Sequence, residues 1–324
     1  MLVPGTAGAQ HRKAPAATAH DPHALAVQVA LDRAGFSPGE IDGQGGAKTR
    51  LALSAFQAAN NLPSSGTSDE ATRAALRVAP EPIISYTITQ HDVAGPFIGS
   101  MPKDMMAAAK LPGFGYTTAL EALAEKFHSS QAFLRRVNPG ASWEAGEVIK
   151  VPDVEPFERP GKTQAKPAAA RGTTAKPSPS APAPKDAGGL VEVVLNGATK
   201  SLVVRDSGGH VLMYAPMTSG SEHDPLPIGE WKVTSVSWNP TFNYNPDLFW
   251  DANPTHSKAK IAPGPNNPVG VVWVDINKEH FGLHGTPEPS TIGRTESHGC
   301  VRLTNWDATR LGKLVAAGTK VTIQ

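Results

Sequence analysis

Hydrophobic positions recur at helical spacing near the start of the chain. Between residues 21 and 80, two apolar series follow the spacing of an amphipathic helix, and Thr67-Ser-Asp-Glu70 has the form of a capping box that opens a third helix ending at Leu76. The two series are Val27, Leu31 and Ala34, and then Leu51, Ala55, Phe56 and Ala59. Residues 21–80 are therefore expected to form three short helices around one small apolar core.

A strand–helix–helix–strand pattern follows in residues 83–154. Ile84–Ile88 and Val148–Pro152 alternate like strands, whereas Ala119–Phe127 and Ser130–Val137 carry the apolar face of a helix. Residues 91–115 separate the first strand from the first helix. A second small module is therefore expected here.

Beyond Leu190 the pattern becomes that of a β domain. Alternating apolar positions predict strands at 191–195, 202–204, 211–214, 229–236, 269–276 and 320–323, and turns rich in Pro and Gly separate them. One helix is expected, Thr304–Val315. Residues 189–324 are therefore expected to form a mainly β domain, and the whole chain a multidomain α+β protein.

Two stretches lack such periodicity. Residues 1–20 predict a disordered tail, and residues 155–188, rich in Pro, Ala, Lys, Thr and Ser, predict a semi-extended linker that cannot bury a core. The reach of such a linker suits a catalytic domain tethered to binding modules, and a plain spacer is equally compatible with it.

Charge and hydropathy exclude several classes of protein. With 30 basic and 29 acidic residues, the formal net charge is +1, which gives no reason to expect nucleic acid or an anionic membrane as a partner. No apolar run is long enough for a transmembrane segment, and the first ten residues have neither the charge nor the apolar stretch of a signal peptide.

The single cysteine, Cys300, indicates nucleophilic chemistry. It lies in Ser297-His-Gly-Cys-Val-Arg302, and a second His-Gly pair begins at His284. A lone thiol forms no intramolecular disulfide, but an imidazole that takes its proton generates the reactive thiolate. Gly299 permits a sharp turn before the nucleophile, and the N–H groups of Gly299 and Cys300 are natural oxyanion donors.

Other interpretations of these residues remain open at this point. His284, His298 and Cys300 together with water would also describe a catalytic zinc site. A histidine on a strand is often structural, which is the expected role of His256 and His280. Tyr244 and Trp250 are candidates for a substrate groove, although core packing is the more common role of such aromatic residues.

The first two modules resemble cell-wall binding families. Gly35-Phe-Ser-Pro-Gly-Glu-Ile-Asp-Gly43, Lys48-Thr49 and Ala55-Phe-Gln57 resemble the peptidoglycan-binding type 1 domain, with Gln44 where that family usually has an aromatic residue. Residues 83–154 resemble a LysM module through Tyr86-Thr-Ile88, Leu120–Phe127, Leu134–Asn138, Gly146 and Val151-Pro152. Relative to the usual LysM spacing, residues 91–115 are an insertion after the first strand.

Residues 190–324 resemble the L,D-transpeptidases of the YkuD family. The resemblance rests on His284-Gly285, on Ser297–Arg302, on Gly220 followed by Pro227-Ile-Gly229, and on Ile261–Gly270. It implies a β-sandwich fold, Cys300 as nucleophile, His284 as general base, and the Gly285 carbonyl as the group that orients the imidazole. It further implies that Ser297, His298 and Gly299 shape the site and that Arg302 binds a substrate carboxylate or braces the loop.

The implied activity is a cysteine acyltransferase without cofactor or metal. Its partners would be peptidoglycan stem peptides and glycan strands, and a lipoprotein would be an alternative acceptor. Water as acceptor would make the protein an L,D-carboxypeptidase, and an inactive wall-binding scaffold is the alternative of another class. The expected location is extracytoplasmic, in the periplasm or cell wall, with a signal peptide absent from this sequence.

Overall fold

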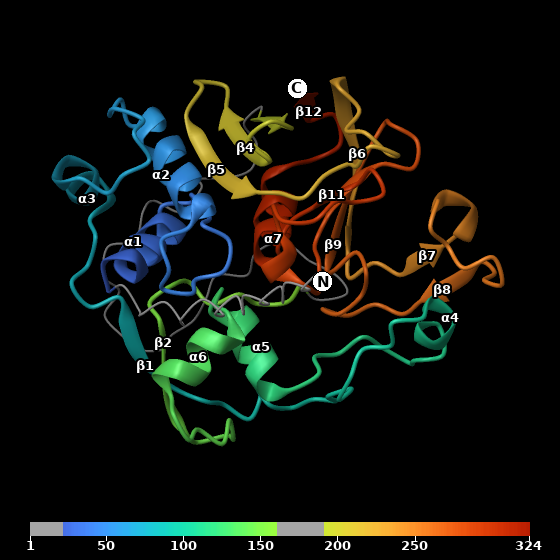
Figure 1. The fold of residues 1–324 in the computed structure, drawn as a ribbon, viewed down its shortest axis with the longest axis horizontal. Helices are drawn as coiled ribbons and strands as arrows, with labels where there is room; N and C mark the ends of the chain where they lie inside the picture. Colours follow the sequence, from blue (N-terminus) through green and yellow to red (C-terminus); the bar gives the residue numbers. More distant parts are fainter. Residues whose placement is uncertain (1–21, 161–190) are drawn as a thin grey trace, which may run out of the picture.

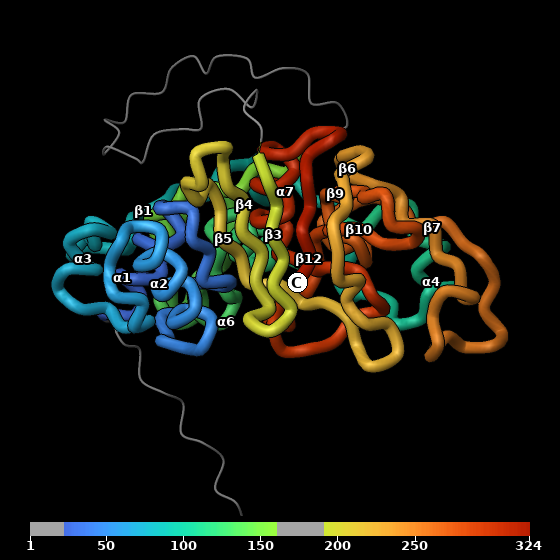
Figure 2. The backbone as a smooth tube through the Cα atoms, turned by 90° about the horizontal axis from the view of Figure 1, so that it is seen from above, coloured from blue at the N-terminus to red at the C-terminus, as the bar shows by residue number. Residues whose placement is uncertain are grey.

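A computed structural model describes residues 22–160 and 191–324, which pack side by side as a helical part, a central sheet and a smaller outer hairpin (Figures 1 and 2). The predicted tail, residues 1–20, and residues 161–188 of the predicted linker lie outside the described residues. No helix within the described part has both the length and the apolar character needed to cross a membrane.

The three N-terminal helices are α1 (Pro22–Arg33), α2 (Ala47–Ala59) and α3 (Glu70–Leu76). Their core includes Phe36 and Phe56, whose rings meet edge to face with centroids 5.3 Å apart. Two details of the prediction were wrong. The N-cap of α3 is Asp69, which accepts the Thr72 N–H, rather than Thr67. Leu51 is 38% exposed, because Ala52, Leu53 and Phe56 form the buried face of α2.

The second module has the predicted order of elements. Strands β1 (Ile83–Thr87) and β2 (Val148–Pro152) pair antiparallel, and α5 (Ala119–Lys126) and α6 (Gln131–Val137) lie between them in the sequence. The side chains of Thr118 and Ser130 cap the two helices by accepting backbone N–H groups. Phe127, Phe133 and Leu134 fill the core of this module.

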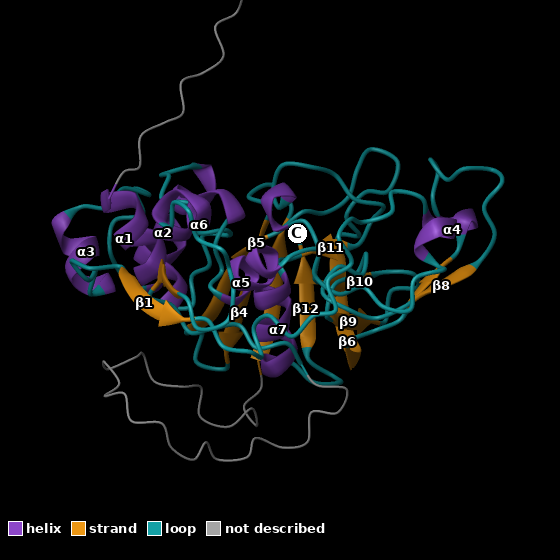
Figure 3. Cartoon of the chain, turned by 90° about the horizontal axis from the view of Figure 1, so that it is seen from below, coloured by secondary structure: helices purple, strands orange, loops and turns teal. Residues whose placement is uncertain are grey.

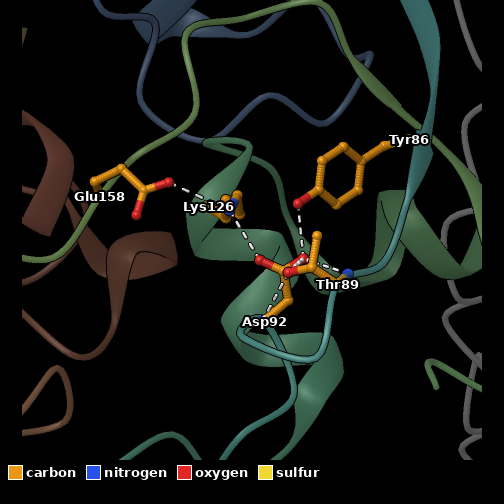
Figure 4. A network of polar contacts seen from close by, with 5 residues as sticks. All are labelled: Tyr86, Thr89, Asp92, Lys126 and Glu158. Atoms are coloured by element: carbon orange, nitrogen blue, oxygen red, sulfur yellow. Dashed lines mark hydrogen bonds and ion pairs between the residues drawn. The ribbon is translucent and has the colours of Figure 1, made fainter. Parts of the chain in front are cut away.

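A buried carboxylate ties this module together (Figure 4). The Asp92 side chain, 3% exposed, accepts hydrogen bonds from Tyr86 Oη at 2.7 Å, Thr89 N at 2.8 Å and Lys126 Nζ at 2.8 Å. Burial acts to raise the pKa of Asp92, but these donors outweigh it and lower the pKa to about 2. Lys126 also pairs with Glu158 at 3.3 Å, so the network fixes the chain segment that follows β2.

The insertion crosses to the C-terminal domain. Its short helix α4 (Met105–Ala108) lies against the outer hairpin of β7 (Phe242–Tyr244) and β8 (Ala259–Ile261) (Figure 1). Phe114, 1% exposed, packs in the same cluster as Tyr244 and Ile261. The insertion is therefore structural support for the loop region 241–268.

The C-terminal domain is built on one eight-stranded sheet of order β11-β10-β9-β6-β12-β3-β4-β5. Its strands are β3 (Val191–Asn196), β4 (Ser201–Asp206), β5 (Val211–Pro216), β6 (Gly229–Trp238), β9 (Val272–Ile276), β10 (Gly282–His284), β11 (Val301–Arg302) and β12 (Lys320–Ile323). The first part of β6 pairs with β12 and the second part with β9, with a register shift between Val233 and Ser235. The prediction of a mainly β domain is confirmed: β6 joins the two halves of one continuous sheet, and strands of both halves contribute to the same core.

Helix α7 (Asn305–Leu314) packs on this sheet and faces both N-terminal modules (Figure 3). Asp307 accepts a hydrogen bond from Ser37 Oγ at 2.8 Å, and the Trp306 ring stacks on His128 with centroids 5.1 Å apart. Phe157 lies in the core of the C-terminal domain and Pro160 is also buried, so the linker predicted from residue 155 is packed at these two positions, whereas the other residues of 155–160 are exposed. Both N-terminal modules therefore pack against the C-terminal domain, in addition to being joined to it through the linker.

Candidate active site

Strands β10 and β11 bring the two halves of the sequence motif together. They pair in parallel, with Leu283 opposite Val301 and His284 opposite Arg302. Leu283 and Val301 are 1% and 0% exposed and belong to the core, so the alternation of a strand directs His284 and Arg302 to the opposite face. Cys300 precedes Val301 and falls on the same face as His284.

The imidazole of His284 is buried and oriented by the backbone. Its Nδ1 lies 2.6 Å from the Gly285 carbonyl oxygen, and its ring stacks on Trp273 with centroids 5.3 Å apart. Because a carbonyl only accepts, Nδ1 carries the proton and Nε2 keeps its lone pair. Burial, opposed by the Gly285 bond and assisted by the Arg302 charge, lowers the pKa of His284 to about 4. The ring is therefore neutral at pH 7 and can act as a base.

The thiol of Cys300 is held in its neutral form. Its Sγ lies 3.7 Å from the His280 carbonyl oxygen, and among the described residues it makes no hydrogen bond to His284. Burial raises the pKa of the thiol; the Gly282 backbone N–H and the Arg302 charge oppose this, and the Asp224 charge adds to it. In this arrangement thiol and imidazole are both uncharged, which differs from a preformed thiolate–imidazolium pair.

Ser297 fixes the turn that carries the cysteine. Its Oγ donates to the Cys300 carbonyl at 2.7 Å and accepts the Gly220 N–H at 2.8 Å, while its own N–H donates to the Gly220 carbonyl at 3.1 Å. The two bonds between Ser297 and Gly220 anchor this loop to the chain segment that follows β5. Gly299 has φ +97°, a conformation that residues other than glycine rarely adopt, so the glycine expected before the nucleophile is required by the turn.

Aromatic residues form one wall beside the cysteine loop. His298 Nε2 lies 2.8 Å from Asp251 Oδ1, and the His298 ring is 5.6 Å from Trp250, measured between centroids. Trp250 is 59% exposed and stacks on His223 at 4.4 Å. An exposed indole beside the motif is suited to contact a bound ligand.

Tyr244 lies deeper than Trp250. It is 4% exposed, and its hydroxyl group bonds to His256 Nδ1 at 2.9 Å. His256 bonds in turn to Asp104 of the insertion at 2.8 Å. Both residues therefore connect the outer hairpin to the insertion, and a direct contact of Tyr244 with substrate stays a prediction.

The described residues contain no group of three or more His, Cys, Asp or Glu side chains placed to hold a metal ion. His284, His298 and Cys300 thus do not form the three-ligand set that the zinc hypothesis requires.

Two protein-family models match this chain. The model of the L,D-transpeptidase catalytic domain matches residues 190–323. This match covers almost all of the C-terminal domain and less than half of the chain. A second model, described as "Putative peptidoglycan binding domain", matches residues 21–76. The transpeptidase domain thus follows a peptidoglycan-binding domain in the same chain, and both sequence resemblances are confirmed.

The individual relatives of the chain are also named as L,D-transpeptidases. The chain is 26% identical over 208 residues to the "Putative L,D-transpeptidase YkuD" of Bacillus licheniformis, a match covering 63% of this chain and 92% of that protein. It is 31% identical over 134 residues to the "Probable L,D-transpeptidase YbiS" of Escherichia coli K12, where the match spans 40% of this chain and 43% of that protein. Among solved structures, "L,D-transpeptidase from Mycobacterium smegmatis" shows 20% identity and a TM-score of 0.35 over 42% of this chain and 59% of that one.

Three residues that contact or act on this site were not predicted from the sequence. Trp273 stacks on His284; its place between Val272 and Val274 on a buried strand was a usable signal, since it puts the indole on the face of His284. Asp224 acts on the Cys300 thiol through its charge, and Asn305 packs against Gly285. Nothing local in the sequence marks these last two.

Proposed function

We propose that the chain is an L,D-transpeptidase of peptidoglycan in which Cys300 is the nucleophile and His284 the general base. The observation that supports this most strongly is the shared face of β10 and β11, which carries a neutral, backbone-oriented imidazole beside the only cysteine of the chain. The family of residues 190–323 and the peptidoglycan-binding domain at residues 21–76 supply the substrate class.

The acylation step follows from the protonation states. As Cys300 Sγ attacks the carbonyl carbon of the third residue of a stem tetrapeptide, Nε2 of His284 takes the thiol proton. The N–H groups of His298, Gly299 and Cys300 surround the oxyanion. The bond to the terminal D-Ala then breaks, the imidazolium gives its proton to the leaving amine, and a thioester remains on Cys300.

The second step releases the acyl group. An amine of a neighbouring stem loses its proton to His284 and attacks the thioester carbonyl; the carbon–sulfur bond breaks, and the thiol regains the proton. The product is a 3→3 cross-link, or an anchored protein when the amine belongs to a lipoprotein. Water in place of the amine would give carboxypeptidase activity.

The other site residues take supporting roles in this proposal. Ser297 and Gly299 shape the nucleophile turn, and the Gly285 carbonyl orients the base. Arg302, whose Cα is level with His284, and Trp250 are proposed to contact the substrate.

The second module is proposed to be LysM-like and to bind glycan, supported by its β1-α5-α6-β2 order. A substrate in the cell wall implies an extracytoplasmic location for the protein.

Mass spectrometry of muropeptides incubated with the wild type and with Cys300→Ala tests the proposal. We expect loss of D-Ala and a cross-linked product only with the wild type. Tetrapeptide turnover by Cys300→Ala would refute the nucleophile, and tripeptide without cross-links would assign water as the acceptor. Acylation by a carbapenem should fail in His284→Ala, since the base is needed for proton transfer. No acylation of the wild type would instead favour an inactive binding scaffold.

A further inference from the structure

A buried polar contact links the second module to the catalytic histidine. Asn305, the first residue of α7, is 0% exposed. Its Nδ2 donates to both carboxyl oxygens of Glu125 at 3.2 Å and to the Pro265 carbonyl at 3.0 Å. Its Oδ1 accepts the Val271 N–H at 3.2 Å. Glu125 belongs to α5, so this amide group is shared between two parts of the chain that lie 180 positions apart in sequence.

The Asn305 amide group also lies in close contact with Gly285, whose carbonyl orients His284. The Oδ1 of Asn305 lies so close to the Cα atoms of Gly285 and Gly270 that a Cβ at either glycine would collide with it. The Gly285 carbonyl, one bond from that Cα, accepts the His284 Nδ1 proton at 2.6 Å. A displacement of Asn305 would therefore be transmitted to the hydrogen bond that holds the imidazole.

The ionised form of Glu125 is energetically unfavourable at this position. The residue is 7% exposed, has no cationic partner within ion-pair distance in the described part of the chain, and is satisfied by the Tyr116 hydroxyl at 3.0 Å and by Asn305. Burying an ionised carboxylate without a counter-ion lowers stability. Burial, opposed by the bonds from Asn305 and Tyr116, also raises the pKa of Glu125 to about 8. An apolar side chain would fill a simple packing role without this penalty.

We propose that Glu125 is a positioning residue for His284: it holds the Asn305 amide against Gly285, so that the Gly285 carbonyl keeps the imidazole in its active tautomer and orientation. The module that precedes the catalytic domain thus completes the catalytic site from outside it. This inference rests on the proposed role of His284 as the base.

The test compares full-length variants in tetrapeptide turnover, with kcat and KM measured separately. Glu125→Ala should lower kcat about tenfold and leave KM within about twofold, because a small misplacement of the base affects the chemical step rather than substrate binding. Glu125→Gln keeps an acceptor for Asn305 and Tyr116 and should restore most of kcat. Asn305→Asp loses the amide donor and should lower kcat as Glu125→Ala does. If circular dichroism shows that Glu125→Ala is unfolded, the kcat of Asn305→Asp tests the positioning role instead.

Two controls separate positioning from general effects of the interface. Glu121→Ala removes a carboxylate one turn earlier on α5, which bonds to Thr117, and should leave kcat unchanged. Ser37→Ala removes the contact to Asp307 on α7 and should also leave kcat unchanged. A loss of kcat in Ser37→Ala equal to that in Glu125→Ala would overturn the inference in favour of general docking.

The remaining outcomes distinguish this inference from the proposed function. Folded Glu125→Ala and Asn305→Asp proteins with normal kcat, alongside an inactive His284→Ala, would overturn the positioning role alone. An active His284→Ala would overturn the proposed function, and the positioning role with it.

Discussion

The resting state of Cys300, the proposed nucleophile, gives the sharpest test of the site, because it predicts how this thiol reacts as a function of pH. Iodoacetamide alkylates the thiolate, and Cys300 is the only cysteine, so the intact mass reports labelling of this residue alone. Burial and the Asp224 charge raise the pKa of the thiol, while the Gly282 N–H and Arg302 only partly compensate. The neutral His284 adds no positive charge to stabilise a thiolate.

The expected magnitude follows from the thiolate fraction. An ordinary thiol with a pKa of about 8.5 is only about 3% thiolate at pH 7, and a raised pKa leaves less. Well below its pKa, the thiolate fraction increases about tenfold for each pH unit. The alkylation rate should therefore increase roughly 100-fold between about pH 6 and pH 8. A preformed thiolate–imidazolium pair would give a nearly constant rate over the same range.

Two charge variants supply the controls for this experiment. Asp224→Asn removes a negative charge near the sulfur and should move the rate profile to lower pH, whereas Arg302→Gln removes a positive charge and should move it to higher pH. A rate that is flat from pH 6 to pH 8 in the wild type would refute the neutral resting state. Equal shifts of the two variants in one direction would refute the electrostatic account.

Three further predictions concern stability. Folding raises the pKa of Glu125 from 4.5 to about 8, so its neutral carboxyl group contributes stability that is complete below pH 4.5 and is lost as pH rises through 8. Urea unfolding of the wild type should therefore show a loss of stability on the order of 3 kcal/mol between about pH 5 and about pH 8. Glu125→Gln should not show this loss. Asp92→Asn should destabilise the protein by about 2 kcal/mol in urea at pH 7, since it leaves the largely buried Lys126 with only the exposed Glu158 as a carboxylate partner. The wild type should lose a similar contribution as pH falls from 3.8 towards 2. Phe114→Ala should lower the free energy of unfolding by about 3 kcal/mol and increase hydrogen exchange in residues 241–268. Phe97→Ala in the same insertion, where the ring is 37% exposed, should lower it by less than about 1 kcal/mol. Equal losses for the two variants would contradict the role given to the insertion.

Local patterns predicted the elements well wherever a single face had to be buried. The helix expected at Ser130–Val137 begins one residue later, with Ser130 as its cap, and the strand expected at Val148–Pro152 has those bounds. Errors arose where the choice depended on what packs from outside. Leu51 and Ala52 are both apolar, and only the position of the other helices decides which one is buried.

The site divides in the same way. The pairing of His284 with the Cys300 strand was predictable, since a motif of that spacing and composition leaves few arrangements. Tyr244 shows the opposite case. Its contact with substrate stays a prediction, but its burial in one cluster with Phe114 of the insertion was not predictable, because periodicity in residues 91–115 gives no indication of where that segment packs.

The docked modules change what counts as the catalytic unit. Phe157 lies in the core of the C-terminal domain, although it belongs to the chain segment that leaves the second module. Asn305 and Trp306, at the start of the helix that follows the nucleophile strand, are 0% and 3% exposed, and Glu125 and His128 are among the residues that cover them. Without these partners the Asn305 amide and the Trp306 indole would be exposed to water, and the close contact of Asn305 with Gly285 would lose its support. Residues 191–324 match a family model of their own but are one part of a larger folding unit, and in the proposed mechanism the chemistry at Cys300 depends on contacts from outside these residues.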